Sequence, residues 1–171
     1  MDLDRRTFLG AGPALLAAGG EASAAAPAPP LRRIATEEAW SIPEHVDALG
    51  QLATSAWTNL DVISERGMNS RTGLGRALVD MDERLRIMDQ TGVDMHLLSL
   101  TSPGVQLFDA DRAVAMAALA NDRMAEIVRR RPDRFAGLAS FAPQDPARAA
   151  REMERCINGL KLNGFIVNSH T

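Results

Sequence analysis

Strand-like and helix-like segments alternate along most of this 171-residue chain, and this alternation constrains the fold more than any other feature. Short apolar runs at residues 32–36, 93–100, 134–141 and 164–168 are the strand candidates. The stretches between them can form crossover helices, so the pattern favours a parallel sheet with right-handed connections. The expected fold class is α/β, of the parallel (β/α)8 TIM-barrel type.

Three crossover helices and one shorter helix are predicted from apolar residues that recur every three or four positions. The crossover helices are expected at residues 76–90, 111–130 and 146–160, and the shorter helix at 45–52. Gly92 is a stop signal for the first of them. A closed barrel has eight strands. The chain is therefore expected to be a barrel truncated to about its first four βα units.

The first thirty residues predict an export signal. Arg5-Arg6, followed by Phe8-Leu9 and an apolar stretch, resembles a bacterial twin-arginine signal, and the small residues at 22–26 supply a cleavage site. The apolar stretch is shorter than the roughly twenty residues that span a bilayer. We expect residues 1–26 to be the signal, 27–30 an Ala/Pro linker and 31–171 the folded domain. The mature protein is then periplasmic, without membrane association after cleavage.

Charge and cysteine content exclude some classes of partner and site. The formal net charge is −3, and no basic stripe is present, so a nucleic-acid partner is not expected. Cys156 is the single cysteine, which excludes an internal disulfide. It lies on an apolar helical stripe and is expected to be a buried hydrophobic residue rather than a nucleophile.

Polar residues follow the predicted strands, and in a parallel sheet such residues gather at one edge. This edge is expected to carry a carboxylate, hydroxyls, amides and an imidazole, from Glu37, Glu38, Thr101, Ser102, Gln144, Asn168 and His170. The set suits a polar substrate or a metal ion. Turn capping is the alternative role for Thr101, Ser102 and Asn168.

Strand alternation separates the two adjacent glutamates. Glu37 and Ala39 should lie on one face of the first strand and Glu38 on the other, so one carboxylate at most points into the barrel mouth. An inward Glu37 can serve as a metal ligand or general base, and pairing with Arg32 or Arg33 is the alternative.

The two other histidines are expected to have structural positions. His45 follows Pro43-Glu44 and is predicted to be a surface residue at a helix start. His96 lies inside the apolar second strand and is predicted to be a satisfied core or interface residue.

Several motifs in order carry a resemblance to a known family. They are the segments 34–40 (IATEEAW), 78–92 with its charged 80–84 stretch, 98–106 (LSLTSPGVQ), 120–122 (AND), 131–135 (RPDRF), 142–146 (APQDP) and 168–171 (NSHT). Together they resemble the amino-terminal part of the metal-dependent aromatic decarboxylases of the amidohydrolase superfamily. That group includes the 5-carboxyvanillate, γ-resorcylate and 2,3-dihydroxybenzoate decarboxylases.

The resemblance implies a carboxy-lyase acting on a small aromatic carboxylic acid of the hydroxybenzoate type. It implies that Glu37 binds a divalent metal, Mn or Zn. Thr101, Ser102 and Asn168 are expected to contact the substrate because they follow the strands, and His170, which also belongs to the matching NSHT motif, is expected to do so with them. The remaining metal ligands and the proton carrier are expected beyond Thr171. The full-length protein is then an enzyme, and this chain alone is expected to be inactive.

Two other readings stay open. The same superfamily fold can hydrolyse a lactone or an amide with a metal and activated water. Alternatively, the chain is a non-catalytic truncated product that associates with another half-barrel or binds a small acid. A homo-oligomer of the full-length protein also stays open.

Overall fold

The structure is a computed structural model, and it describes residues 31–53 and 69–168 of the chain. The predicted export signal, the predicted Ala/Pro linker and His170 lie outside the described residues.

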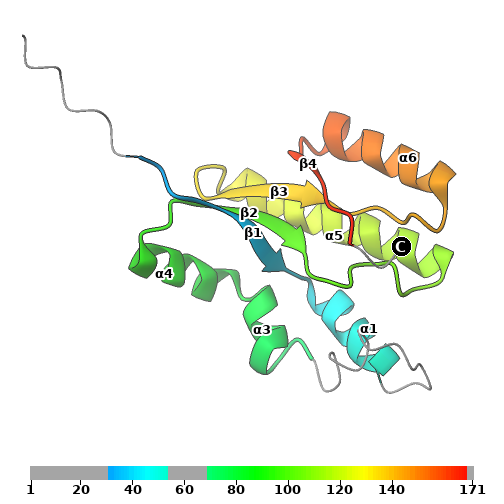
Figure 1. Ribbon diagram of the computed structural model, residues 1–171, viewed down its shortest axis with the longest axis horizontal. Coiled ribbons are helices and arrows are strands. Elements are labelled where there is room, and N and C mark those ends of the chain that lie inside the picture. The colour runs from blue at the N-terminus through cyan, green and yellow to red at the C-terminus, as the bar shows by residue number, and fades with distance from the viewer. Residues whose placement is uncertain (1–30, 54–68, 169–171) are drawn as a thin grey trace, which may run out of the picture. The chain divides into compact units, whose positions relative to one another are not determined.

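Four parallel strands form one sheet in the order β1-β2-β3-β4, and the arrows of β1, β2 and β3 point the same way (Figure 1). The strands are β1 (Ile34–Trp40), β2 (Met95–Leu100), β3 (Phe135–Ala139) and β4 (Gly164–Phe165). The predicted α/β class with a parallel sheet is confirmed. β1 extends beyond the predicted range of 32–36 because Glu38, Ala39 and Trp40 pair with β2.

The helices are α1 (Pro43–Ala53), α3 (Gly73–Val79), α4 (Met81–Thr91), α5 (Ala110–Arg130) and α6 (Pro146–Glu154), followed by a π-helical turn, η1 (Arg155–Gly159). The carboxylates of Asp80, Asp109 and Asp145 each accept a backbone N–H and cap α4, α5 and α6. Among the described residues, no helix combines the length and apolar character needed to cross a membrane.

Two of the predicted helices are not single continuous α-helices. The single helix predicted at 76–90 is wrong, because Asp80 has an extended backbone and its carboxylate accepts the Glu83 N–H 3.0 Å away, so α3 ends and α4 begins there. The helix predicted at 146–160 changes to π geometry at Arg155. The stop at Gly92 is confirmed, since Gly92 has a left-handed φ of 67° after α4.

The core lies between the helices and one face of the sheet. Alternate residues of β2 and β3 are buried, including Leu98 and Phe135, whereas the residues between them are half-buried. Gly137 lets α5 approach β3 closely, because a Cβ at this position would lie 2.5 Å from the Met124 sulfur. The half-buried face carries Leu97 and Ser99 of β2, and the corresponding face of a complete barrel points inward.

Candidate functional site

A β-bulge in β1 determines where the two glutamates point. Ala35 pairs with His96 and Glu38 pairs with Leu98, so β1 has one residue more than β2 over this span. Thr36 and Glu37 therefore both lie opposite a single residue of β2. Glu38 shares the helix side of the sheet with Leu98, while Glu37 is exposed on the other side. The predicted separation of Glu37 from Glu38 is confirmed.

Glu38 belongs to a polar cluster between the sheet and α4. Its carboxylate accepts from Arg84 at 3.2 Å, and the same Arg84 guanidinium donates to the Ala39 carbonyl at 2.6 Å. His96 Nδ1 lies 3.3 Å from the Glu38 carboxylate. Burial lowers the pKa of Arg84, and also that of His96 although the Glu38 charge opposes the shift. Glu38 is therefore a structural partner of Arg84, and His96 is the satisfied core residue that was predicted.

The β2–α5 loop, residues 101–109, forms one side of the sheet's carboxyl edge. It continues the strand pairing at first, because the Thr101 N–H donates to the Trp40 carbonyl at 2.8 Å. The Gly104 N–H then donates back to the Thr101 carbonyl at 2.8 Å. Further along, the Gln144 amide donates to the carbonyls of Val105 and Phe108, both at 3.0 Å. Side chains from other elements thus hold the loop by its backbone oxygens.

His45 of α1 is fully buried against this loop, so its predicted surface position is wrong. Its Nε2 lies 2.9 Å from the Gly104 carbonyl and its Nδ1 lies 2.7 Å from the Ser41 hydroxyl. A carbonyl only accepts, so we assign the proton to Nε2 and let Ser41 donate to Nδ1. Burial lowers the pKa of His45 to about 4, although the Gly104 hydrogen bond opposes the shift. The imidazole is neutral at pH 7.

The sequence did contain a signal for the buried position of His45. Ile42 just before α1, together with Val46 and Leu49 within it, continues one apolar stripe, and His45 lies in this stripe at helical spacing. The partner that satisfies the ring, the Gly104 carbonyl, lies 59 positions away and has no sequence signature.

Asn121 fixes the carboxyl end of β3. Its buried amide donates to the Ser140 carbonyl at 2.8 Å and accepts from the Ser140 N–H at 2.8 Å. The same amide donates to Glu152 of α6 at 2.8 Å. Burial alone would raise the pKa of Glu152, but hydrogen bonds from Arg155 and Asn121 outweigh it and lower the pKa. This buried amide was not identified from the sequence as a site residue.

The predicted substrate residues partly come together. Thr101 is half-buried, Ser102 is exposed, and both begin the β2–α5 loop. Asn168, after β4, reaches the same loop, because a side chain at Gly104 would collide with the Asn168 amide. Gly104 also has a left-handed φ of 66°, which favours glycine. Glu37 lies three residues before the end of β1, and His170 lies outside the described residues.

The described residues do not fit a complete metal centre. Across residues 31–53 and 69–168, no three His, Cys, Asp or Glu side chains come close enough to hold one ion. Glu37 offers a single carboxylate, and Ala39 on the same face offers no ligand. A catalytic metal site uses about three protein ligands.

Cys156 is buried, as predicted. Burial and the neighbouring Glu152 carboxylate raise the pKa of its thiol to about 12, which keeps the sulfur protonated and a poor nucleophile.

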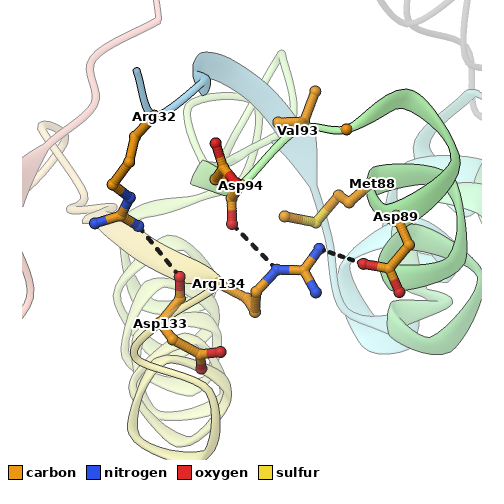
Figure 2. Close-up of a pocket in the computed structure, with 8 residues that line it drawn as sticks. Arg32, Met88, Asp89, Val93, Asp94, Asp133 and Arg134 are labelled. Carbon is orange, nitrogen blue, oxygen red and sulfur yellow. Dashed lines mark hydrogen bonds and ion pairs between the residues drawn. The ribbon is translucent and has the colours of Figure 1, made fainter. Parts of the chain in front are cut away.

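A cavity of about 490 Å³ lies at the opposite, amino end of the strands (Figure 2). Arg134 lies at its centre, donating to the Asp94 carbonyl at 3.1 Å and pairing with Asp89 at 2.7 Å. Arg32 donates to the Asp133 carbonyl at 3.3 Å. Polar groups at this end of a parallel barrel serve stability, whereas the chemistry of such barrels takes place at the carboxyl end. We therefore assign the cavity a structural role.

Comparisons with known proteins agree with this arrangement. A family model described as amidohydrolase matches residues 23–171. A γ-resorcylate decarboxylase of Rhizobium radiobacter is 37% identical over 138 residues, which are 80% of this chain and 38% of that protein. The chain thus spans about two fifths of the length of this relative.

Solved structures are similar to the described fold. The 5-carboxyvanillate decarboxylase of Sphingomonas paucimobilis has a TM-score of 0.78 and 50% identity over 83% of this chain and 44% of its own. The corresponding enzyme of Novosphingobium aromaticivorans, complexed with manganese and 4-hydroxy-3-methoxy-5-nitrobenzoic acid, has a TM-score of 0.74 and 38% identity over 82% of this chain and 42% of its own. These relatives are TIM-barrel proteins, which confirms the predicted barrel type.

Proposed function

Since the chain belongs to the amidohydrolase family, we propose that the protein is a carboxy-lyase that removes CO₂ from a small aromatic acid without redox chemistry. The supporting observation is the 50% identity to a 5-carboxyvanillate decarboxylase over 83% of this chain. In this reaction the ring carbon that bears the carboxylate gains a proton. The bond to the carboxylate then breaks, its electron pair returns to the ring, and CO₂ leaves.

The carboxyl edge of the sheet is the proposed substrate site. Thr101 and Ser102 bring hydroxyls and Asn168 brings an amide to one loop, and such groups can bind a carboxylate or phenol oxygen. His170 follows Asn168 by two residues and completes the proposed set. The substrate class is a hydroxybenzoate-type acid.

The proposed cofactor is a divalent ion, Mn or Zn, with Glu37 as one of its ligands. A structural relative was solved with manganese, which supports a divalent metal. Glu37 is the better candidate ligand of the two glutamates. The register of β1 places Glu38 on the helix side of the sheet, where its carboxylate is already paired with Arg84. The other ligands would come from outside the described residues.

The test is CO₂ release by the full-length protein. It is purified with Mn²⁺ or Zn²⁺ and incubated with 5-carboxyvanillate or 2,6-dihydroxybenzoate. We expect one equivalent of CO₂ for each aromatic acid consumed. The metal-loaded protein is also incubated with a panel of lactones and amides. Hydrolysis of any of them, without CO₂ release from any acid, would reject the decarboxylase proposal in favour of a metal-dependent hydrolase.

We also propose that the protein is exported, with residues 1–26 as the signal. The supporting feature is Arg5-Arg6 ahead of a short apolar run. Changing both arginines to lysine should leave an uncleaved precursor in the cytoplasm, detected by immunoblot of cell fractions. Normal trimming and periplasmic recovery of the double variant would reject this signal.

A further inference from the structure

We propose that His45 is a positioning residue that holds the β2–α5 loop, and with it Thr101 and Ser102, in place at the substrate site. The role in substrate binding rests on the proposed function, whereas the role in holding the loop rests on geometry alone. His45 lies on α1, outside the set of residues that would touch the substrate.

The first step of the argument is the hydrogen-bonded chain from α1 to the loop. The Ser41 hydroxyl donates to Nδ1 at 2.7 Å, and Nε2–H donates to the Gly104 carbonyl at 2.9 Å. The His45 ring also packs edge-on against Phe108, with ring centroids 6.1 Å apart. The ring therefore contacts the loop at two points.

The second step is the position of Gly104 in the loop. Its N–H donates to the Thr101 carbonyl at 2.8 Å, so the carbonyl that His45 binds belongs to the turn that carries Thr101 and Ser102. Gly104 is buried and packs closely against the Asn168 amide. A shift of Gly104 would thus move the polar groups of the β2–α5 loop and also those of the segment after β4.

The third step is that Gln144, which also holds this loop, binds carbonyls that follow Gly104 in the sequence. Gln144 binds the carbonyls of Val105, Gln106 and Phe108. It leaves the Gly104 carbonyl to His45. Loss of the imidazole would leave this carbonyl buried without its donor, which favours a rearranged turn.

Two substitutions separate the contact from the bulk of the side chain. In His45→Gln, the amide nitrogen occupies about the position of Nε2 and can still donate to Gly104. In His45→Asn, the amide reaches only the position of Nδ1, so the contact with Ser41 can remain while the one with Gly104 is lost. Glu44→Gln, one residue earlier and exposed, is the control on the same helix.

The measurements on the intact protein are backbone amide exchange by mass spectrometry and steady-state kinetics with the aromatic acid. For His45→Asn we expect exchange at residues 101–106 to rise about tenfold and KM to rise roughly tenfold, with a smaller change in kcat, since one buried hydrogen bond is lost. His45→Gln and Glu44→Gln should stay within about threefold of the unmodified protein. If His45→Asn does not fold, His45→Met gives the comparison, because its side chain fills a similar space without a donor for the Gly104 carbonyl, and the same rise in loop exchange is expected.

Equal loop exchange in the Asn and Gln variants would overturn the proposal. So would faster loop exchange with an unchanged KM, since the loop would then not position the substrate. An unmodified protein without decarboxylase activity would defeat only the proposed function, because the exchange comparison still decides whether His45 holds the loop.

Discussion

Glu37 and Glu38 are adjacent, chemically identical residues with different surroundings. Glu38 is bound to Arg84 on the helix side, and the Arg84 guanidinium also ties down the Ala39 carbonyl. Glu37 lies within the bulge, directly before Glu38. It is exposed on the face that points inward in a complete barrel. The pair therefore divides into one structural carboxylate and one that is available for a ligand.

Substitution of each glutamate by glutamine in the intact protein should separate these roles. Glu37→Gln should lower metal occupancy and CO₂ release by about 100-fold or more, on the scale of a lost metal contact, while the melting temperature of the metal-free protein changes little. Glu38→Gln should retain the metal and lower the free energy of unfolding by about 1–2 kcal/mol. Metal content by mass spectrometry and thermal melts measure both effects. The reverse pattern would show that the assignment of the two glutamates is inverted.

The buried His45 predicts a pH dependence of stability. The unfolded chain protonates this residue near its ordinary pKa of 6.5, whereas burial lowers the folded-state pKa to about 4. Between these values the unfolded state binds more protons, so stability falls as the pH decreases through this window, by up to roughly 3 kcal/mol. Urea unfolding from pH 7 to pH 4 should show the decline in the unmodified protein and a shallower one in His45→Gln. His96 contributes a similar slope to both proteins, so equal slopes would mean that the buried His45 adds nothing.

For single residues, the sequence predicted which face of a strand a side chain lies on better than it predicted which groups the side chain contacts. Alternation correctly placed Glu37 and Glu38 on opposite faces, because the period of a strand is local. The bulge was not foreseen, since it depends on pairing with β2. His45 was misplaced because its burial depends on a carbonyl from a distant loop.

At the scale of helices and strands, local signals predicted α5 closely and failed where two local signals compete. The buried face of α5 is apolar except for Asn121, and the helix begins within one residue of the expected position. The predicted helix at 76–90 has a continuous apolar pattern too. Within it Asp80 is also a good N-cap, and the cap divides the segment into α3 and α4.

The spacing between α5 and β3 gives a prediction at the same scale. Gly137→Ala would place a methyl group 2.5 Å from the Met124 sulfur and 3.1 Å from a Leu162 methyl, in a packed core. We expect the free energy of unfolding to fall by about 1–3 kcal/mol. Gly159→Ala is the matched control, because its methyl group would meet the Arg155 side chain at an ordinary 3.9 Å. Chemical denaturation measures both, and an equal effect of the two substitutions would mean that α5 does not pack closely on Gly137.

For the whole molecule, the sequence predicted the parallel sheet and the edge at which Thr101, Ser102 and Asn168 gather. It could do so because connection length and strand character determine parallel pairing, and parallel pairing brings the strand ends together. The hydrogen bonds that shape this edge, from His45, Asn121 and Gln144 to backbone groups, were not predictable. Each of them joins residues that lie 19 to 59 positions apart in the sequence.

The same sheet leads to a prediction for the isolated segment 31–171. Its β1 and β4 are the edges of the described sheet, and the face opposite the helices carries half-buried apolar residues such as Leu97 and Leu138. Parallel sheets in stable domains are covered on both faces, and exposed edges and apolar surface promote association. We expect the segment to bind a hydrophobic dye such as ANS and to elute from a sizing column as an assembly larger than a monomer. Lowering the protein concentration should shift the elution toward the monomer and increase dye binding per chain, since dissociation exposes the apolar face. A monomer at all concentrations, with a cooperative melt and no dye binding, would show that the segment covers this face by itself.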